Sequence, residues 1–95
     1  MITELLELYI VDTKQRIGEL RIALNEQDMK RLQRTAHSLK GSSDSLGIRG
    51  MTTLCIKLDE QVKDMRFAGI GTVLTQLENE FEHVQEALAC DLQPA

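Results

Sequence analysis

Proline is absent from the first 93 residues of this chain, and the only one is Pro94. Since proline is the residue that most strongly interrupts a helix, helices before this position can run long. Apolar residues also recur at alternating spacings of three and four, whereas the alternating β-branched and aromatic stretches typical of strands are missing. The sequence therefore predicts an all-α fold.

Four helical segments follow from the apolar stripes and from the polar or glycine-containing breaks between them. Breaks are predicted at residues 25–27, 45–47 and 66–71, and Asp28 is placed to cap the second helix. Short connections favour antiparallel neighbours, so we expect a single domain over residues 1–95, folded as an antiparallel up-down-up-down four-helix bundle. The predicted core stripes are Leu6, Ile10, Thr13, Ile17, Leu20 and Leu24; Met29, Leu32, Ala36, Leu39 and Ser43; Met51, Cys55, Leu58, Val62 and Met65; and Ile70, Val73, Leu74, Leu77, Phe81, Val84 and Leu88.

The charge balance limits the classes of partner. The formal net charge is −4 and the sequence pI is about 5.1, which argues against general binding of nucleic acid or anionic membranes. No signal peptide or long apolar run is found, and Cys55 and Cys90 form no Cys-x-x-Cys motif. We therefore expect a cytoplasmic protein without nucleic-acid binding or direct membrane contact, whose cysteines act as small apolar side chains.

His37 is predicted to face solvent on the second helix. At about 100° per residue, Leu32 and Leu39 project about 180–220° away from it, so the apolar stripe lies on the other side. An exposed imidazole is thus expected within a locally positive field. The residues within about 60° of the histidine are Lys30, Gln33, Arg34, Lys40, Gly41 and Asp44.

Such a face suits phosphoryl transfer. A neutral imidazole nitrogen can attack a phosphoryl group, and the phosphoramidate that forms can pass the group onward. The ammonium of Lys40, one turn after the histidine, is placed to stabilise negative charge on the phosphoryl oxygens; Arg34 and Lys30 are weaker candidates for this role. Gly41 leaves no side chain over the face, so a partner can approach closely.

Residues 37–43, HSLKGSS, followed by Gly47, resemble the H-x-L-K-G core of histidine-containing phosphotransfer (HPt) domains. Residues 5–13 and 54–60 resemble the first and third helices of that family. The resemblance implies a four-helix bundle whose histidine accepts a phosphoryl group from an aspartate of one receiver domain and donates it to an aspartate of another. Its implied partners are response-regulator receiver domains, a hybrid sensor histidine kinase, or both, with Mg²⁺ on the receiver domain and no cofactor in this chain.

The resemblance also implies roles for individual residues. His37 matches the phosphorylated histidine of the family, and Lys40 and Gly41 match its supporting positions. Asp44 departs from the pattern, because relatives more often have a small uncharged residue there. Its carboxylate is expected to offset Lys40 or to influence the choice of partner.

Two apolar residues of the first helix project away from its core face. Relative to Ile17, Leu8 lies at about 180° and Val11 at about 120°. We expect both, together with the His37 face, to contribute to an apolar patch on which a receiver domain packs. Ordinary scattered apolar surface residues are the alternative.

A metal site is a second interpretation of the histidines. Glu80 and His83 fit the Glu-x-x-His pair of di-iron bundles, but such bundles need a second copy, and the residue three before His37 is Arg34. The sequence therefore predicts no metal site.

Autonomous kinase activity is not expected either, since no glycine-rich or Walker-type phosphate cradle is present. Phosphate must then come from another protein. The remaining alternative to a phosphotransfer intermediate is a non-catalytic helical adaptor that binds a receiver domain. An adaptor has no chemical need for the histidine, the lysine and the glycine at these spacings.

Overall fold

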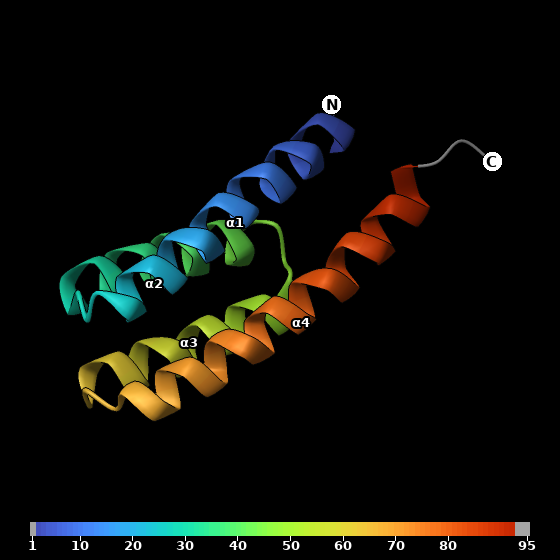
Figure 1. Cartoon of the computed structure of the whole chain (residues 1–95). Coiled ribbons are helices and arrows are strands. Elements are labelled where there is room, and N and C mark those ends of the chain that lie inside the picture. Colours follow the sequence, from blue (N-terminus) through green and yellow to red (C-terminus); the bar gives the residue numbers. More distant parts are fainter. Residues whose placement is uncertain (1, 93–95) are drawn as a thin grey trace.

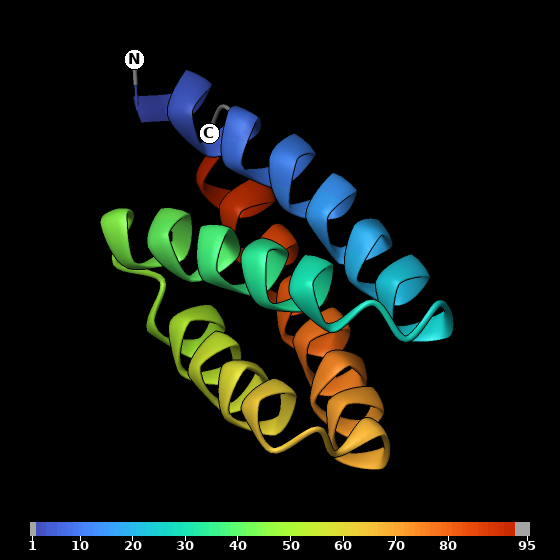
Figure 2. The same cartoon turned by 90° about the vertical axis from the view of Figure 1, so that its left-hand side faces the viewer.

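A computed structural model describes the backbone of residues 2–92 and the side chains of residues 4–88. This part of the chain consists of four helices and no strand: α1 (Ile2–Asn25), α2 (Met29–Ser45), α3 (Arg49–Lys63) and α4 (Phe67–Leu92). Consecutive helices run in opposite directions (Figures 1 and 2). The predicted all-α, antiparallel four-helix bundle is confirmed.

Each helix packs against two others. Contacts join α1 to α2, α2 to α3, α3 to α4 and α4 to α1, so the described helices form a closed ring around one core. The bundle is elongated, with extents of 46 × 20 × 19 Å. The longer helices α1 and α4 project past the α2–α3 pair, and the start of α1 and the end of α4 lie at the same end of the molecule (Figure 1). None of the described helices has the length and apolar character needed to cross a membrane.

The core consists mainly of the predicted apolar stripes. Burial of one such side chain contributes about 1.5–3 kcal/mol, so packing of the stripes, more than helix propensity, stabilises the bundle. The apolar side chains with no exposed surface are Leu20, Ala23, Leu32, Ala36, Leu39, Met51, Cys55, Leu58, Ile70, Leu74 and Leu77.

The three connections share one backbone design. Each contains a residue in the left-handed conformation, at Gln27 (φ 55°), Gly47 (φ 71°) and Met65 (φ 56°). In each, the next N–H donates to the carbonyl five residues earlier, which is the pattern of a Schellman C-cap. After the first connection, the Asp28 carboxylate accepts a hydrogen bond of 3.1 Å from the Arg31 N–H. The predicted cap of the second helix is confirmed.

Two details of the predicted helices are wrong. Met65 does not lie on the buried face of the third helix but in the turn after it, where its side chain is 63% exposed. The fourth helix begins at Phe67, so Gly69 and Gly71 lie within its first turns and not in a connection. The cost of about 1 kcal/mol for each glycine is offset by apolar neighbours in the same turns, such as the fully buried Ile70.

A small polar cluster is buried between α1 and α2. The Tyr9 hydroxyl and the Ser43 hydroxyl are hydrogen-bonded at 2.8 Å, and burial raises the pKa of the Tyr9 phenol. Thr13 is fully buried nearby, as its place in the predicted stripe requires, and its Oγ1 has no hydrogen-bond partner. Tyr9 was not among the predicted core residues, and it connects the first helix to the end of the second.

Cys55 behaves as the sequence predicts, as a buried apolar side chain. Burial raises the pKa of its thiol to about 12, so the group stays protonated and unreactive near neutral pH. The prediction for Cys90 falls outside the described side chains.

Candidate functional site

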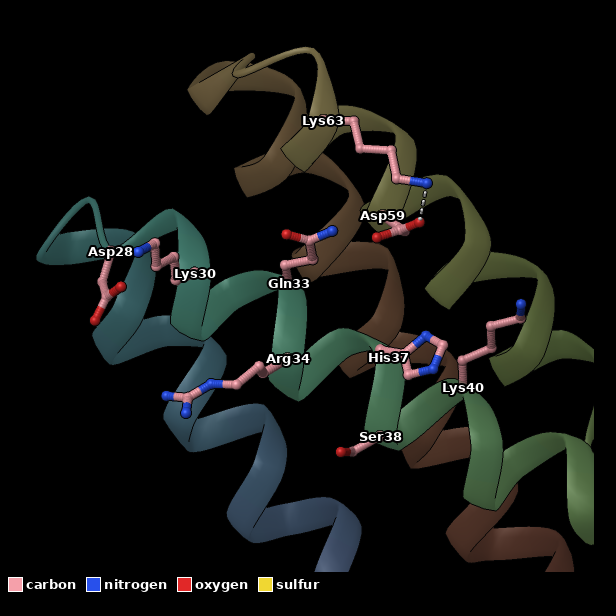
Figure 3. Close-up of a pocket in the computed structure, with 9 residues that line it drawn as sticks. All are labelled: Asp28, Lys30, Gln33, Arg34, His37, Ser38, Lys40, Asp59 and Lys63. Carbon is pink, nitrogen blue, oxygen red and sulfur yellow. Dashed lines mark ion pairs between the residues drawn. The ribbon is translucent and has the colours of Figure 1, made fainter.

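A shallow depression of about 1000 Å³ lies between the exposed face of α2 and the neighbouring face of α3 (Figure 3). It opens on the side of α2 that the helical projection assigned to His37, opposite the buried Ala36 and Leu39. The residues that line it are Asp28, Lys30, Gln33, Arg34, His37, Ser38, Lys40, Asp59 and Lys63.

His37 lies in the middle of this surface. Its side chain is exposed, as predicted, and Figure 3 shows the imidazole ring pointing towards α3. Lys40 follows one turn later and extends towards α3 beside the ring, whereas Arg34 and Ser38 point the other way, towards α1 (Figure 3). An imidazole and an ammonium group are therefore presented together at the mouth of the depression.

The depression carries more positive than negative charge. Four cationic side chains line it, Lys30, Arg34, Lys40 and Lys63, against two carboxylates. One carboxylate, that of Asp28, caps α2, and the other, that of Asp59, pairs with Lys63 at 3.1 Å. This is the only ion pair among the nine lining residues (Figure 3). The other three cations form no ion pair with these carboxylates, and of them Lys40 extends beside the imidazole ring whereas Arg34 points towards α1 (Figure 3).

Two residues predicted to share this surface lie further along α2. Asp44 is exposed but does not line the depression. It follows His37 by seven residues, which is about 10 Å along the helix axis, and a projection down the axis does not represent this separation. Gly41 is also exposed, and a Cβ atom built on it would meet no heavy atom within 4 Å beyond its chain neighbours and the backbone of its own helix.

Leu8 and Val11 are each 65% exposed, so the prediction that the core does not use them is confirmed. Leu8 lines a separate, largely apolar groove between α1 and the end of α2. Val11 lines neither this groove nor the His37 depression. The groove, called the α1–α2 groove below, is lined by Leu5, Leu8, Tyr9, Asp12, Ser42, Ser45 and Leu46.

The α3 wall of the depression was missed by sequence reasoning. Asp59 and Lys63 each directly follow a buried residue of the third helix, Leu58 and Val62, and so lie at the edge of its apolar stripe. Polar residues at such an edge border a neighbouring helix. The place of Asp59 and Lys63 at the edge of the apolar stripe was the available sequence signal, although it does not show which helix the two side chains face.

Among residues 4–88, no group of three or more metal-ligating side chains comes together. His83 Nδ1 lies 4.0 Å from a carboxylate oxygen of Glu80, on the exposed side of α4.

Comparison with known proteins agrees with this architecture. The sequence model of the Hpt domain matches residues 4–87, most of the chain. The chain belongs to the Hpt domain family. The description "histidine-containing phosphotransfer protein 2" belongs to a relative from Arabidopsis thaliana that is 28% identical over 90 residues. That alignment covers 92% of this chain, whereas the chain spans only 58% of the length of the Arabidopsis protein.

Solved structures of histidine-containing phosphotransfer proteins share the fold of this Hpt domain. Histidine-containing phosphotransfer protein B (HptB) from Pseudomonas aeruginosa is 28% identical and superposes with a TM-score of 0.90, over 94% of this chain and 77% of the HptB chain. A histidine-containing phosphotransfer protein from maize is 25% identical and superposes with a TM-score of 0.87, over 98% of this chain and 73% of its own.

Proposed function

We propose that this Hpt domain is a phosphotransfer intermediate of a multistep His-Asp relay and that His37 is its phosphorylated residue. The observation that carries the proposal is an exposed imidazole in the middle of α2, in a depression where three of the four lining cations form no ion pair with a lining carboxylate. Membership of the Hpt domain family supports the same reaction.

The proposed transfer begins with a receiver domain that carries an aspartyl phosphate. The lone pair of the unprotonated ring nitrogen of His37 attacks phosphorus, an N–P bond forms and the P–O bond to the aspartate breaks. The aspartate leaves as a carboxylate. Because the attacking nitrogen of a neutral imidazole carries no proton, no base has to remove one first. In the second half of the cycle, the carboxylate of another receiver attacks phosphorus, and the imidazole leaves.

Lys40 is the proposed electrostatic stabiliser in both steps. The transition state for phosphoryl transfer spreads negative charge over three oxygens, and an ammonium group held beside them lowers the barrier. Lys30 and Gln33 would contact the phosphoryl group or the partner from the same wall, and Arg34, which points towards α1, would contact the partner. Gly41 would give the partner room, because nothing covers its Cα on the solvent side.

The proposed partners are response-regulator receiver domains and hybrid sensor histidine kinases. Leu8 and Val11 would contribute apolar contact area on α1, and Asp44 would act as a charged residue of the docking surface. The Mg²⁺ of the reaction would be held by the receiver domain and not by this chain. A cytoplasmic location is also part of the proposal.

Intact-mass analysis at mildly alkaline pH tests the reaction. After incubation with a phosphorylated receiver domain, the protein is expected to gain one phosphoryl group that is lost on acidification. His37→Gln should abolish the gain. His83→Gln, a matched change at the other histidine, which lies exposed on α4, should leave the gain intact.

Two outcomes would contradict the proposal. If several phosphorylated receivers bind without transferring a phosphoryl group, the non-catalytic adaptor is the correct interpretation. If the gain survives in His37→Gln, a different residue carries the phosphoryl group.

The docking residues need a separate test. Leu8→Lys is expected to weaken receiver binding by about tenfold, as expected when a contact of about 1.4 kcal/mol is lost. Ile22→Lys is the control, because Ile22 is 48% exposed on the same helix but lines neither the depression nor the α1–α2 groove. Equal affinities of the two variants would show that the receiver does not dock on Leu8.

A further inference from the structure

The α3 wall of the depression presents a lysine together with its own anion. Lys63 Nζ lies 3.1 Å from Asp59 Oδ2, one turn earlier on the same helix. Both residues line the depression that contains His37, and Figure 3 shows the pair facing it from α3. A carboxylate repels a phosphoryl group held in the same depression, because both are negatively charged. The presence of Asp59 in this depression therefore needs an explanation.

We propose that Asp59 and Lys63 form an exchangeable ion pair that sets how firmly the phosphoryl group is held on His37. This inference rests on the proposed function and deepens it. In the unphosphorylated protein, Lys63 pairs with Asp59. When His37 is phosphorylated, Lys63 turns to the phosphoryl oxygens and leaves the Asp59 carboxylate unpaired beside them.

The exposures of the two side chains favour this exchange. The Lys63 side chain is 63% exposed and has a long flexible stem, so its ammonium can reorient at little cost. The Asp59 side chain is short and only 27% exposed, so its carboxylate stays close to the depression when the lysine leaves. The lysine therefore moves and the negative charge remains.

The balance of charge gives the direction of the exchange. Pairs of this exposed kind are weak, so the Asp59–Lys63 contact is easily broken. A phosphoryl group carries about −1.5 to −2 charges, more than a carboxylate, and attracts the ammonium more strongly. After the exchange, repulsion between the Asp59 carboxylate and the phosphoryl group opposes the attraction from Lys63 and Lys40.

This arrangement suits a phosphotransfer protein that must donate its phosphoryl group as well as accept one. Cations alone would stabilise phosphohistidine and make onward transfer less favourable. A fixed carboxylate in the same depression raises the free energy of the phosphorylated form only. Asp59 is therefore inferred to increase the tendency of His37 to give up its phosphoryl group.

The lifetime of the phosphorylated protein tests the inference without a partner protein. Phosphoramidate serves as a small phosphoryl donor: its P–N bond breaks, ammonia leaves and the N–P bond to His37 forms. After the donor is removed, water attacks phosphorus and releases inorganic phosphate. Intact-mass analysis over time gives the half-life of the phosphorylated species.

Asp59→Asn is expected to lengthen this half-life by about two- to fivefold, the range that corresponds to one screened surface charge. Lys63→Gln should shorten it by a similar factor, because it removes the cation and leaves the carboxylate. Glu60→Gln is the matched control, since Glu60 is the exposed neighbour of Asp59 on α3, carries the same charge and does not line the depression. Its half-life should equal that of the wild type.

The outcomes separate this inference from the proposed function. If the wild type takes up no phosphoryl group on His37, both are wrong. If it is phosphorylated but Asp59→Asn and Glu60→Gln decay at the same rate, only the exchange is wrong, and the Asp59–Lys63 pair is merely structural. The ¹³C signal of the Asp59 carboxyl group gives an independent readout, because it should shift on phosphorylation in the wild type but much less in Lys63→Gln.

Discussion

Gly41→Ala is expected to make the protein more stable and at the same time a slower phosphoryl carrier. Gly41 lies inside α2, on the exposed surface, and the added methyl group would meet no atom within 4 Å beyond its chain neighbours and the backbone of its own helix. An alanine in a helix interior is about 0.5–1 kcal/mol more favourable than a glycine. For a domain of this size, 1 kcal/mol corresponds to about 4–8 °C, so Tm should rise by roughly 2–8 °C.

The expected loss of transfer has a different cause. If a receiver packs closely over Gly41, the methyl group overfills that contact at a cost of about 1–3 kcal/mol. The rate of transfer from a phosphorylated receiver should then fall by about 5- to 140-fold. Rapid quenching followed by intact-mass analysis measures this rate, and circular dichroism at 222 nm measures Tm.

Gly18→Ala is the matched control for both measurements. Gly18 is an exposed glycine inside α1 with the same open surroundings, and it lies outside the depression. Gly18→Ala should gain similar stability and transfer at the wild-type rate. Equal transfer rates in the two alanine variants would refute the idea that Gly41 provides clearance, and a lower Tm in Gly41→Ala would refute the open surroundings deduced for it.

Three further predictions concern the stability and chemistry of the bundle. Tyr9→Phe leaves the buried Ser43 hydroxyl without its partner and should lower the free energy of unfolding by about 1–3 kcal/mol; an unchanged urea midpoint would contradict this. Burial raises the pKa of Cys55 to about 12, so iodoacetamide at pH 8 should alkylate this thiol in urea but not in the folded protein, as read by peptide mass mapping. Hydrogen bonding from Arg21 lowers the pKa of Glu78, so the pair stabilises the fold above the unfolded-state value near 4.3, by at most about 1 kcal/mol at this exposed site. The difference in urea midpoint between wild type and Glu78→Gln should therefore be present at pH 7 and vanish as the pH falls through the lowered pKa; a difference that persists at pH 2 would rule out this origin.

The exposed face of α2 could be predicted from the sequence because it depends on one helix alone. A period of 3.6 residues and the buried Leu32 and Leu39 are enough to turn His37 and Lys40 outward. The positions of Asp59 and Lys63 depend instead on how two helices cross, and a pattern along one helix does not contain that angle. The sequence therefore predicted the α2 side of the depression but not its α3 side.

The ends of helices were predicted less well than their faces for a similar reason. Met65 continues the spacing of the third helix, yet it is itself the left-handed residue of the Schellman turn that ends that helix. Tyr9 was not among the predicted core residues, and the sequence of the first helix does not show which residue could pair with a buried hydroxyl at this position. Ser43, which supplies that partner, comes from a helix 34 residues further along the chain.

The shared end of the bundle at which α1 starts and α4 finishes has a consequence for tethered partners (Figure 2). The residues around His37 belong to α2 and α3, and α1 and α4 project past that pair at the shared end. A receiver joined to either terminus would meet His37 as an intramolecular partner, at an effective concentration set by the linker. A short linker would hold the receiver at the shared end, whereas a flexible linker of several tens of residues would bring it within reach of the histidine along a bundle 46 Å long. Linker length alone could then decide whether the domain exchanges phosphoryl groups within one chain or only with proteins that diffuse to it.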